Sequence, residues 1–148
     1  MDITKIAFNN FMKIKKTNKE EYIFEIQDEP QYLNHLETVH ASVQFALAEA
    51  TSGQYLMKVF EEYTEKGVIP VVRSVEVKYK KPARGAIFSH ATMNDKDIEK
   101  VKDNLNVKGR ALFDVIVKVY DSDNEVTMLS KFTWYILINK LNEKNNFS

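Results

Sequence analysis

The segment from Val39 to about Lys66 constrains the fold more than any other, because it predicts a long helix whose first half is apolar. Thr38 is the expected N-cap, and Gly67, followed by Pro70, supplies the stop. From Val39 to Ala50 the residues are apolar on nearly every side of the helix, whereas Lys and Glu residues gather in the second half. A helix that is apolar all round is a buried helix. The rest of the chain must therefore enclose it.

The remaining segments predict a sheet that can do so. After Pro70 the apolar residues recur every second position, which is typical of a half-buried antiparallel strand. In the first such strand Val75, Val77 and Tyr79 share one face. The predicted strands cover Tyr22–Ile26, Val71–Tyr79, Ile87–Met93, Gly109–Tyr120 and Met128–Ile138, and shorter helices cover Ile3–Ile14 and Asp95–Leu105.

Composition narrows the class of protein. The 148 residues suggest one domain. Twenty-one basic and twenty-one acidic residues give no net charge, so a general attraction to nucleic acid has no basis. Cysteine is absent, which excludes thiolate catalysis and cysteine metal sites. With neither an apolar leader nor a run long enough to span a bilayer, the chain is expected to be soluble and cytoplasmic, without membrane partners.

These observations predict a single α+β domain, residues 1–148, in which an antiparallel sheet wraps around one long helix. Residues 1–15 form an N-terminal helix in this prediction, and residues 141–148 form a polar tail. The last strands are apolar on both faces, since Phe132, Trp134 and Ile136 oppose Tyr135 and Leu137. One helix cannot cover both faces, so self-association is expected.

Two motifs resemble the hotdog-fold acyl-CoA thioesterases, in particular the phenylacetate-pathway type and its uncharacterised bacterial relatives. The first is Asn34-His-Leu-Glu-Thr-Val-His40 followed by Ala-Ser-Val-Gln-Phe-Ala-Leu-Ala-Glu49, with an Asn, a His six residues on and an acid nine residues later. The second is the strand Val75–Tyr79, which ends in a Tyr-x-x-Pro turn at Pro82. The resemblance runs from about residue 22 to residue 139 and implies the hotdog fold.

Glu49 calls for an explanation even without the resemblance, because a desolvated carboxylate on an apolar helix is costly unless it has a partner. Its side chain could reach solvent at an edge of the sheet or pair with a basic group across a dimer seam. The resemblance instead implies that Glu49 is the general base, or the nucleophile, in hydrolysis of an acyl thioester.

The resemblance assigns roles to residues near the start of the helix as well. His40 and the backbone N–H of Ala41 would lie where the helix begins and would polarise the thioester carbonyl. Asn34 would hold the water or the carbonyl. Relatives usually have two glycines after this histidine, whereas here Ala41 and Ser42 follow it, with Ser42 expected beside the substrate.

Lys78, Lys80, Lys81 and Arg84 form a dense basic cluster. Alternation along a strand explains Lys78 and Lys80 as a solvated face. Lys81 and Arg84 flank the Pro82 turn and are candidates to contact the phosphates of coenzyme A. No cofactor is expected, and three histidines without ligand spacing predict no metal site.

Other functions remain open at this stage. Ala41 and Ser42, which replace the two glycines of the relatives, would suit a binding protein that holds an acyl thioester without turning it over. His35 lies fourteen residues before Glu49, the spacing of the catalytic pair in hotdog 3-hydroxyacyl thioester dehydratases, although no Pro or Gly lies between them here. A purely structural dimer is a further alternative. The favoured expectation is a homodimer or homotetramer that acts on an acyl-CoA or an acyl-carrier-protein thioester.

Overall fold

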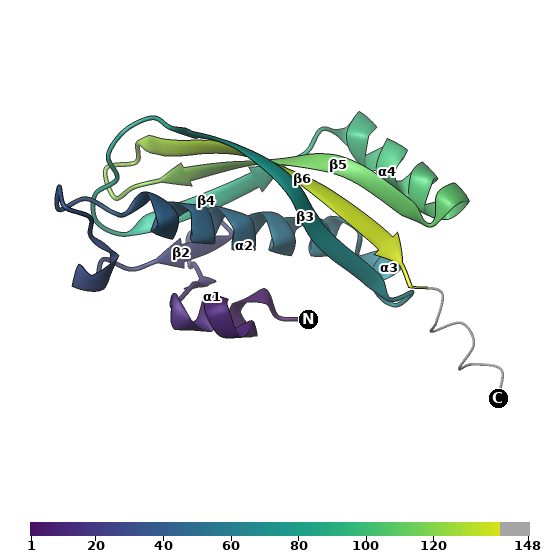
Figure 1. Cartoon of the computed structure of the whole chain (residues 1–148), viewed down its shortest axis with the longest axis horizontal. Coiled ribbons are helices and arrows are strands. Elements are labelled where there is room, and N and C mark those ends of the chain that lie inside the picture. Colours follow the sequence, from purple (N-terminus) through teal and green to yellow (C-terminus); the bar gives the residue numbers. More distant parts are fainter. Residues whose placement is uncertain (140–148) are drawn as a thin grey trace.

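A computed structural model describes residues 1–139, in which a six-stranded antiparallel sheet curves around the long helix α2, Ala41–Val59 (Figure 1). The predicted enclosure of this helix is therefore confirmed. The strands are β1 (Lys15–Lys16), β2 (Phe24–Ile26), β3 (Val68–Tyr79), β4 (Ile87–Thr92), β5 (Arg110–Tyr120) and β6 (Val126–Ile138), and they lie side by side in the order β1-β2-β4-β5-β6-β3. The short strand β1 was not expected from its polar sequence.

The core lies between α2 and the concave face of the sheet. Leu47 and Ala48 on α2 are fully buried, as are Val115, Val117 and Val119 on β5. The two-residue period of β5 is thus confirmed, because its inward residues are buried and its outward residues are not. The apolar half of α2 is what the sheet folds around.

Both ends of the predicted long helix differ from expectation. His40 caps α2, its Nδ1 accepting a hydrogen bond from the N–H of Ser42 (2.9 Å), whereas Thr38 is buried in the preceding loop. Thr38 is therefore not the N-cap. At Phe60 (φ −108°, ψ 28°) the helical path breaks, and the one-turn helix α3, Glu61–Thr64, follows. The helical region then ends at Gly67, which takes a positive φ of 75°.

The N-terminal region is not the single helix predicted for residues 1–15. A 3₁₀ turn, η1 (Ile3–Lys5), is followed by α1 (Ala7–Phe11), and Ile6 between them has an extended ψ of 132°. Another 3₁₀ turn, η2 (Pro30–Tyr32), begins at the proline that ends the strand region. The predicted polar tail, residues 141–148, lies outside the described residues.

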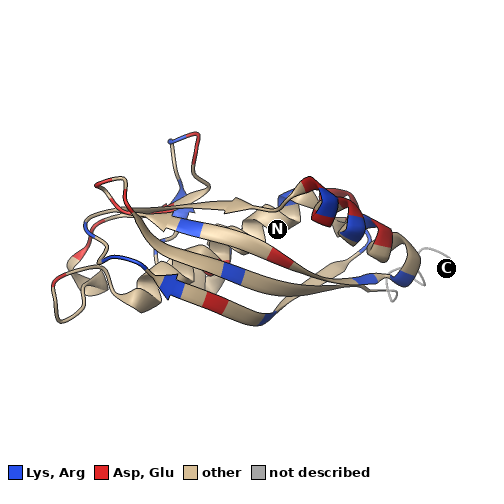
Figure 2. Cartoon of the chain, turned by 90° about the horizontal axis from the view of Figure 1, so that it is seen from above, with Lys and Arg blue, Asp and Glu red and all other residues tan. Residues whose placement is uncertain are grey.

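The helix α4, Asp95–Lys108, joins β4 to β5 and extends beyond the predicted Leu105 to the left-handed cap at Gly109 (φ 68°). Its N-cap is Asn94, whose side chain accepts from the N–H of Asp97 (2.8 Å). Basic and acidic residues alternate on this helix, so it presents no surface of one charge (Figure 2). None of the helices in residues 1–139 has the length and apolar character that crossing a bilayer requires.

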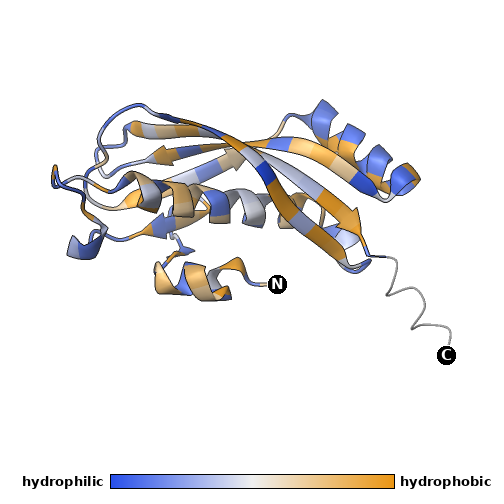
Figure 3. Ribbon diagram, viewed as in Figure 1, coloured by the Kyte–Doolittle hydropathy of each residue, from blue (hydrophilic) through white to orange (hydrophobic). Residues whose placement is uncertain are grey.

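β3 is the long strand at one edge of the sheet. Its inward residues Val72, Val75 and Val77 are only half-buried, because α2 leaves this part of the concave face open. On the other face Ile69 and Val71 are about half exposed. Apolar residues continue along the neighbouring ends of β3 and β6 (Figure 3). This edge of the sheet therefore leaves apolar side chains uncovered.

Candidate functional site

Three of the residues singled out in the sequence line one cavity of about 250 Å³ at the start of α2. They are Asn34 from the loop before the helix, Ala41 from its first turn and Lys81 from the turn after β3. The same cavity is lined by Gln44 and Tyr79, which sequence reasoning did not select.

Asn34 organises the loop that leads into α2. Its Oδ1 accepts from the N–H groups of Leu36 (2.9 Å) and Thr38 (3.1 Å), and its Nδ2 donates to Thr38 Oγ1 (3.0 Å). The backbone N–H of Asn34 donates to the carbonyl of Thr38 (2.8 Å), which closes the loop. The side-chain amide is thus engaged within its own loop, and its position on the cavity wall is fixed.

The first turn of α2 leaves one backbone donor for the cavity. The ring of His40 takes the N–H of Ser42, and the carbonyl of His40 accepts from the N–H of Val43 (3.0 Å). Among the described residues, the N–H of Ala41 has no acceptor. It lies at the positive end of the helix dipole, where it can stabilise a developing negative charge. His40 acts here as the cap, and its side chain is exposed.

Gln44 supplies a second donor. The residue is only 3% exposed, and its Oε1 accepts from Thr127 Oγ1 (2.7 Å). No hydrogen bond holds its Nε2, yet no buried side-chain nitrogen or oxygen in residues 1–139 lacks a partner. The Nε2 atom must therefore reach the surface of the cavity that Gln44 lines. In the sequence, Gln44 can be recognised only as a lone amide within the apolar part of the helix.

Tyr79 ties the end of β3 to the start of α2. Its hydroxyl donates to the carbonyl of Ala41 (3.2 Å). Burial raises the pKa of this phenol above 10.0, so the hydroxyl keeps its proton at neutral pH. The Tyr79 contact thus holds in place the helix turn that carries the free N–H of Ala41.

Glu49 lies two turns further along α2 and does not line this cavity. At 1.5 Å per residue, its Cα is about 12 Å from that of Ala41 along the helix axis. Its side chain is half-buried, and within residues 1–139 the carboxylate has neither a hydrogen bond nor an ion pair. Desolvation by burial raises its pKa above 4.5. One chain alone therefore does not bring Glu49 to Asn34 and Ala41.

Glu49 projects from the side of α2 that faces β6. One turn before it, the ring of Phe45 packs on Phe132 with centroids 5.5 Å apart. One turn after it, Ser52 Oγ accepts from Trp134 Nε1 (3.1 Å). In residues 1–139 the sheet continues beyond β6 with the edge strand β3 alone, so Glu49 lies toward this edge of the sheet.

The remaining predicted residues are exposed or already have partners. Lys81 pairs with Glu125 (2.9 Å), and this hydrogen bond raises the pKa of Lys81. Arg84 holds the adjoining turn through its backbone, its N–H donating to Asp121 Oδ2 (3.2 Å). Ser42 is exposed beside the cap.

His35 is exposed at the tip of the loop that Asn34 closes. Within residues 1–139 no contact joins it to Glu49. No group of three or more acidic or histidine side chains in this part of the chain is placed to hold a metal ion.

A family model covers most of the chain. The model of the family described as "Domain of unknown function (DUF4442)" matches residues 11–136. The chain belongs to this family. The matched region of this DUF4442 protein contains the whole sheet apart from the last residues of β6, together with α2, the Asn34 loop and Glu49. No curated protein matches the sequence.

Solved structures share the fold of this DUF4442 protein. A Pseudomonas aeruginosa protein of unknown function, described as a probable thioesterase, is 19% identical with a TM-score of 0.75, over 93% of this chain and 91% of that one. A Haemophilus influenzae thioesterase is 15% identical with a TM-score of 0.68, over 92% and 86%. A Bacillus halodurans protein crystallised with CoA is 18% identical with a TM-score of 0.60, over 85% and 75%. The hotdog fold expected from the sequence is thereby confirmed.

Proposed function

We propose that this protein hydrolyses an acyl thioester, with Glu49 as the general base or the nucleophile, in a site formed between two copies of the chain. The observation that carries the proposal is the half-buried carboxylate of Glu49, which has no partner among the described residues and a raised pKa. Retaining an unpartnered acid on an apolar helix costs stability, and catalysis gives a reason to keep it. Structural neighbours named as thioesterases, and one crystallised with CoA, support the same class of substrate.

The cavity at the start of α2 suits the thioester carbonyl. Ala41 and Gln44 both line it. The N–H of Ala41 and the Nε2 of Gln44 would serve as two donors that stabilise the oxyanion of a tetrahedral intermediate. The loop clamped by Asn34 forms the adjoining wall. Lys81, which lines the cavity, and Arg84, two residues beyond Pro82, are the candidates to contact the phosphates of coenzyme A.

In the general-base route, Glu49 takes a proton from water as the water oxygen attacks the carbonyl carbon. The carbon–sulfur bond then breaks, and the thiolate leaves with the proton that Glu49 held. In the nucleophilic route, Glu49 attacks the carbonyl carbon directly, releasing the thiolate and forming an anhydride that water hydrolyses. Both routes regenerate the carboxylate and give a free acid and a thiol.

A second copy is required because one chain separates Glu49 from Ala41 by about 12 Å along α2. Two copies paired through their β3 edges, with antiparallel helices, would bring Glu49 of one toward the Ala41 cavity of the other. The half-buried residues of β3 would then be covered. A homodimer is therefore part of the proposal, and pairing of dimers into a homotetramer would cover the outward apolar residues of β3 and β6.

The decisive experiment is a panel of acyl-CoA and acyl-carrier-protein thioesters with detection of the free thiol. Glu49→Gln is expected to lower kcat/KM by at least about a hundredfold, the usual scale for a lost general base. The matched control is Glu65→Gln, since Glu65 is exposed beyond α3 and should leave the rate unchanged. In the parent, kcat/KM should rise with pH through an apparent pKa above that of an ordinary carboxyl group. Equal rates for Glu49→Gln and the parent would remove Glu49 from the mechanism.

The alternative is a protein that binds an acyl thioester without turning it over. It is favoured by Ala41 and Ser42, which stand where relatives usually have two glycines, because the added methyl group restricts approach to the backbone. Binding of a non-hydrolysable thioester analogue, with no thiol released from any member of the panel, would select this alternative.

A further inference from the structure

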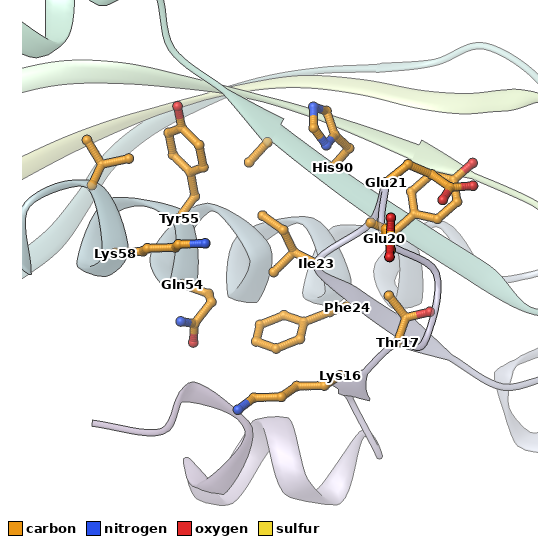
Figure 4. Close-up of a pocket in the computed structure, with 13 residues that line it drawn as sticks. Lys16, Thr17, Glu20, Glu21, Ile23, Phe24, Gln54, Tyr55, Lys58 and His90 are labelled. Atoms are coloured by element: carbon orange, nitrogen blue, oxygen red, sulfur yellow. The ribbon is translucent and has the colours of Figure 1, made fainter.

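A second cleft lies on the opposite side of α2 from Glu49. It has a volume of about 670 Å³ and opens between the C-terminal half of α2 and the segment around β1 and β2 (Figure 4). Lys58 lines it from α2 and follows Glu49 by nine residues, which is about two and a half turns. The two side chains therefore project from opposite sides of the helix. The cleft belongs to the β1–β2 edge of the sheet, away from β3.

The floor of this cleft is apolar. Ile23 is half-buried and lies above the ring of Phe24, which is fully buried beneath the floor (Figure 4). Ala91 of β4 and Val59 of α2 complete the apolar lining. A surface of this kind takes the hydrocarbon body of a small ligand.

The polar groups are divided between the two ends. The ammonium groups of Lys16 and Lys58 and the amide of Gln54 gather at one end, whereas Glu20 and Glu21 lie at the other (Figure 4). Among the described residues, the side chains of Gln54 and Lys58 have no hydrogen bond or ion pair. Gln54 is half-buried and lines the cleft, so its amide is a donor available at the cleft wall. His90, which is half-buried as well, lies above the floor and has no side-chain partner among the described residues.

We infer that this cleft binds a small organic carboxylate with an apolar body. Lys16, Gln54 and Lys58 would hold the carboxylate, because charge-assisted hydrogen bonds from ammonium and amide groups are the strongest available there. The apolar body would lie over Ile23 and beside Tyr55, which are both half-buried, toward His90. Glu20 and Glu21 disfavour a second negative charge at the far end, so the ligand is a monoanion. The site is separate from the Glu49 region and stays open when two copies pair through β3.

The test is a pair of matched probes titrated into the full chain. Benzoate and hexanoate carry the carboxylate, and benzyl alcohol and hexanol keep the body without the charge. We expect both acids to shift the side-chain NMR signals of Gln54 and His90, and each alcohol to bind about tenfold more weakly, the scale of a lost charged hydrogen bond. Hexylamine, which reverses the charge, should not bind at the Lys16 and Lys58 end.

Variants tie the binding to the named groups. Lys58→Met keeps the aliphatic stem and removes the ammonium, so it should weaken benzoate about tenfold and leave benzyl alcohol unchanged. Lys100→Met removes an exposed charge from α4 and should change neither. Glu49→Gln should leave benzoate binding intact, which separates this inference from the proposed hydrolysis. The inference would be overturned by equal affinity for the acid and the alcohol. It would also be overturned if the NMR shifts were confined to Ala41 and Gln44, or if millimolar benzoate caused no shift.

Discussion

At the scale of single residues, Glu49 is the side chain whose surroundings and charge conflict most. It sits among alanines and Phe45 on a helix that the sheet encloses, and within residues 1–139 nothing pairs with it. Burial favours the protonated form, which raises its pKa. A group of this kind weakens the fold when it is ionised.

The sign of that effect gives a prediction. Because the pKa of Glu49 is higher in the folded chain than in the unfolded chain, the folded state binds the proton more tightly between the two values. Stability should therefore fall as pH rises from about 4.5 through the raised pKa. Glu49→Gln, which cannot ionise, should melt a few degrees higher than the parent at neutral pH.

Thermal unfolding across pH checks this, with Glu65→Gln as the exposed control. At about pH 4, below the ordinary carboxyl pKa, Glu49→Gln and the parent should melt together. A lower melting temperature for Glu49→Gln at neutral pH would mean that the carboxylate has a stabilising partner, as a basic group across a dimer seam would provide.

Sequence reasoning singled out Glu49 but not Gln44. A charge on an apolar helix conflicts with burial wherever the helix lies, so it is visible in the sequence. The role of Gln44 depends on Thr127, eighty-three residues away, which takes one end of its amide and leaves the other for the cavity. A contact between α2 and β6 of this kind has no local signal. The contact of Tyr79 with the carbonyl of Ala41 has no local signal either, so the sequence showed Tyr79 only as part of the Tyr-x-x-Pro turn.

At the scale of elements, the loop before α2 and the helix itself act together. The side chain of Asn34 makes four hydrogen bonds with Leu36 and Thr38, and Glu37 within the loop takes a positive φ of 57°. The loop sets the point where α2 begins. Its shape therefore fixes where the N–H of Ala41 points.

Replacing Asn34 tests whether its side chain holds the loop before α2 in place. Asn34→Ala should lower the free energy of unfolding by about 1–2 kcal/mol, because two backbone N–H groups lose their acceptor. Asn34→Asp keeps the acceptor oxygens and should lose less. Chemical denaturation measures both, with Asn18→Ala as the exposed loop control. Equal stabilities for Asn34→Ala and the parent would show that the loop closes without this side chain.

The elements themselves were largely predictable, and their ends were not. The strand β5 and most of β6 follow a two-residue period, and an enclosed sheet preserves that period. The start of α2 depends on which side chain accepts from a free N–H of the first turn. His40 accepts from the N–H of Ser42, whereas Thr38 is held in the preceding loop by Asn34. The break in the helix at Phe60 accompanies a packing contact. The ring of Phe60 packs on that of Phe113 in β5, with ring centroids 5.2 Å apart.

At the scale of the molecule, the uncovered edge at β3 is the feature on which the proposed pairing of two copies rests. The hotdog fold was predictable because the motif order and the enclosed helix both pointed to it. The pairing of copies was anticipated from strands that are apolar on both faces, and it stays a prediction. The second cleft was not foreseen, because its lining comes from β1, β2, α2 and β4, which the sequence does not bring together.

Val75→Lys tests the pairing. It places a charge on the inward, half-buried face of β3, where a second copy would lie, and the mass in light scattering should fall from that of a dimer or tetramer to that of one chain. Val107→Lys, on the exposed face of α4, is the control and should leave the mass unchanged. Any thioesterase activity should be lost with the dimer. A single-chain mass for the parent would contradict the shared site.

The open edge of β3 carries a practical consequence for anyone who handles the protein. A lone copy presents a long row of unpaired backbone N–H and C=O groups, which is a template for unselective strand addition. Dilution, which separates copies, should therefore reduce any thioesterase activity per chain, and the separated copies should add to one another less selectively when they are concentrated again. Purification and assay are best kept concentrated.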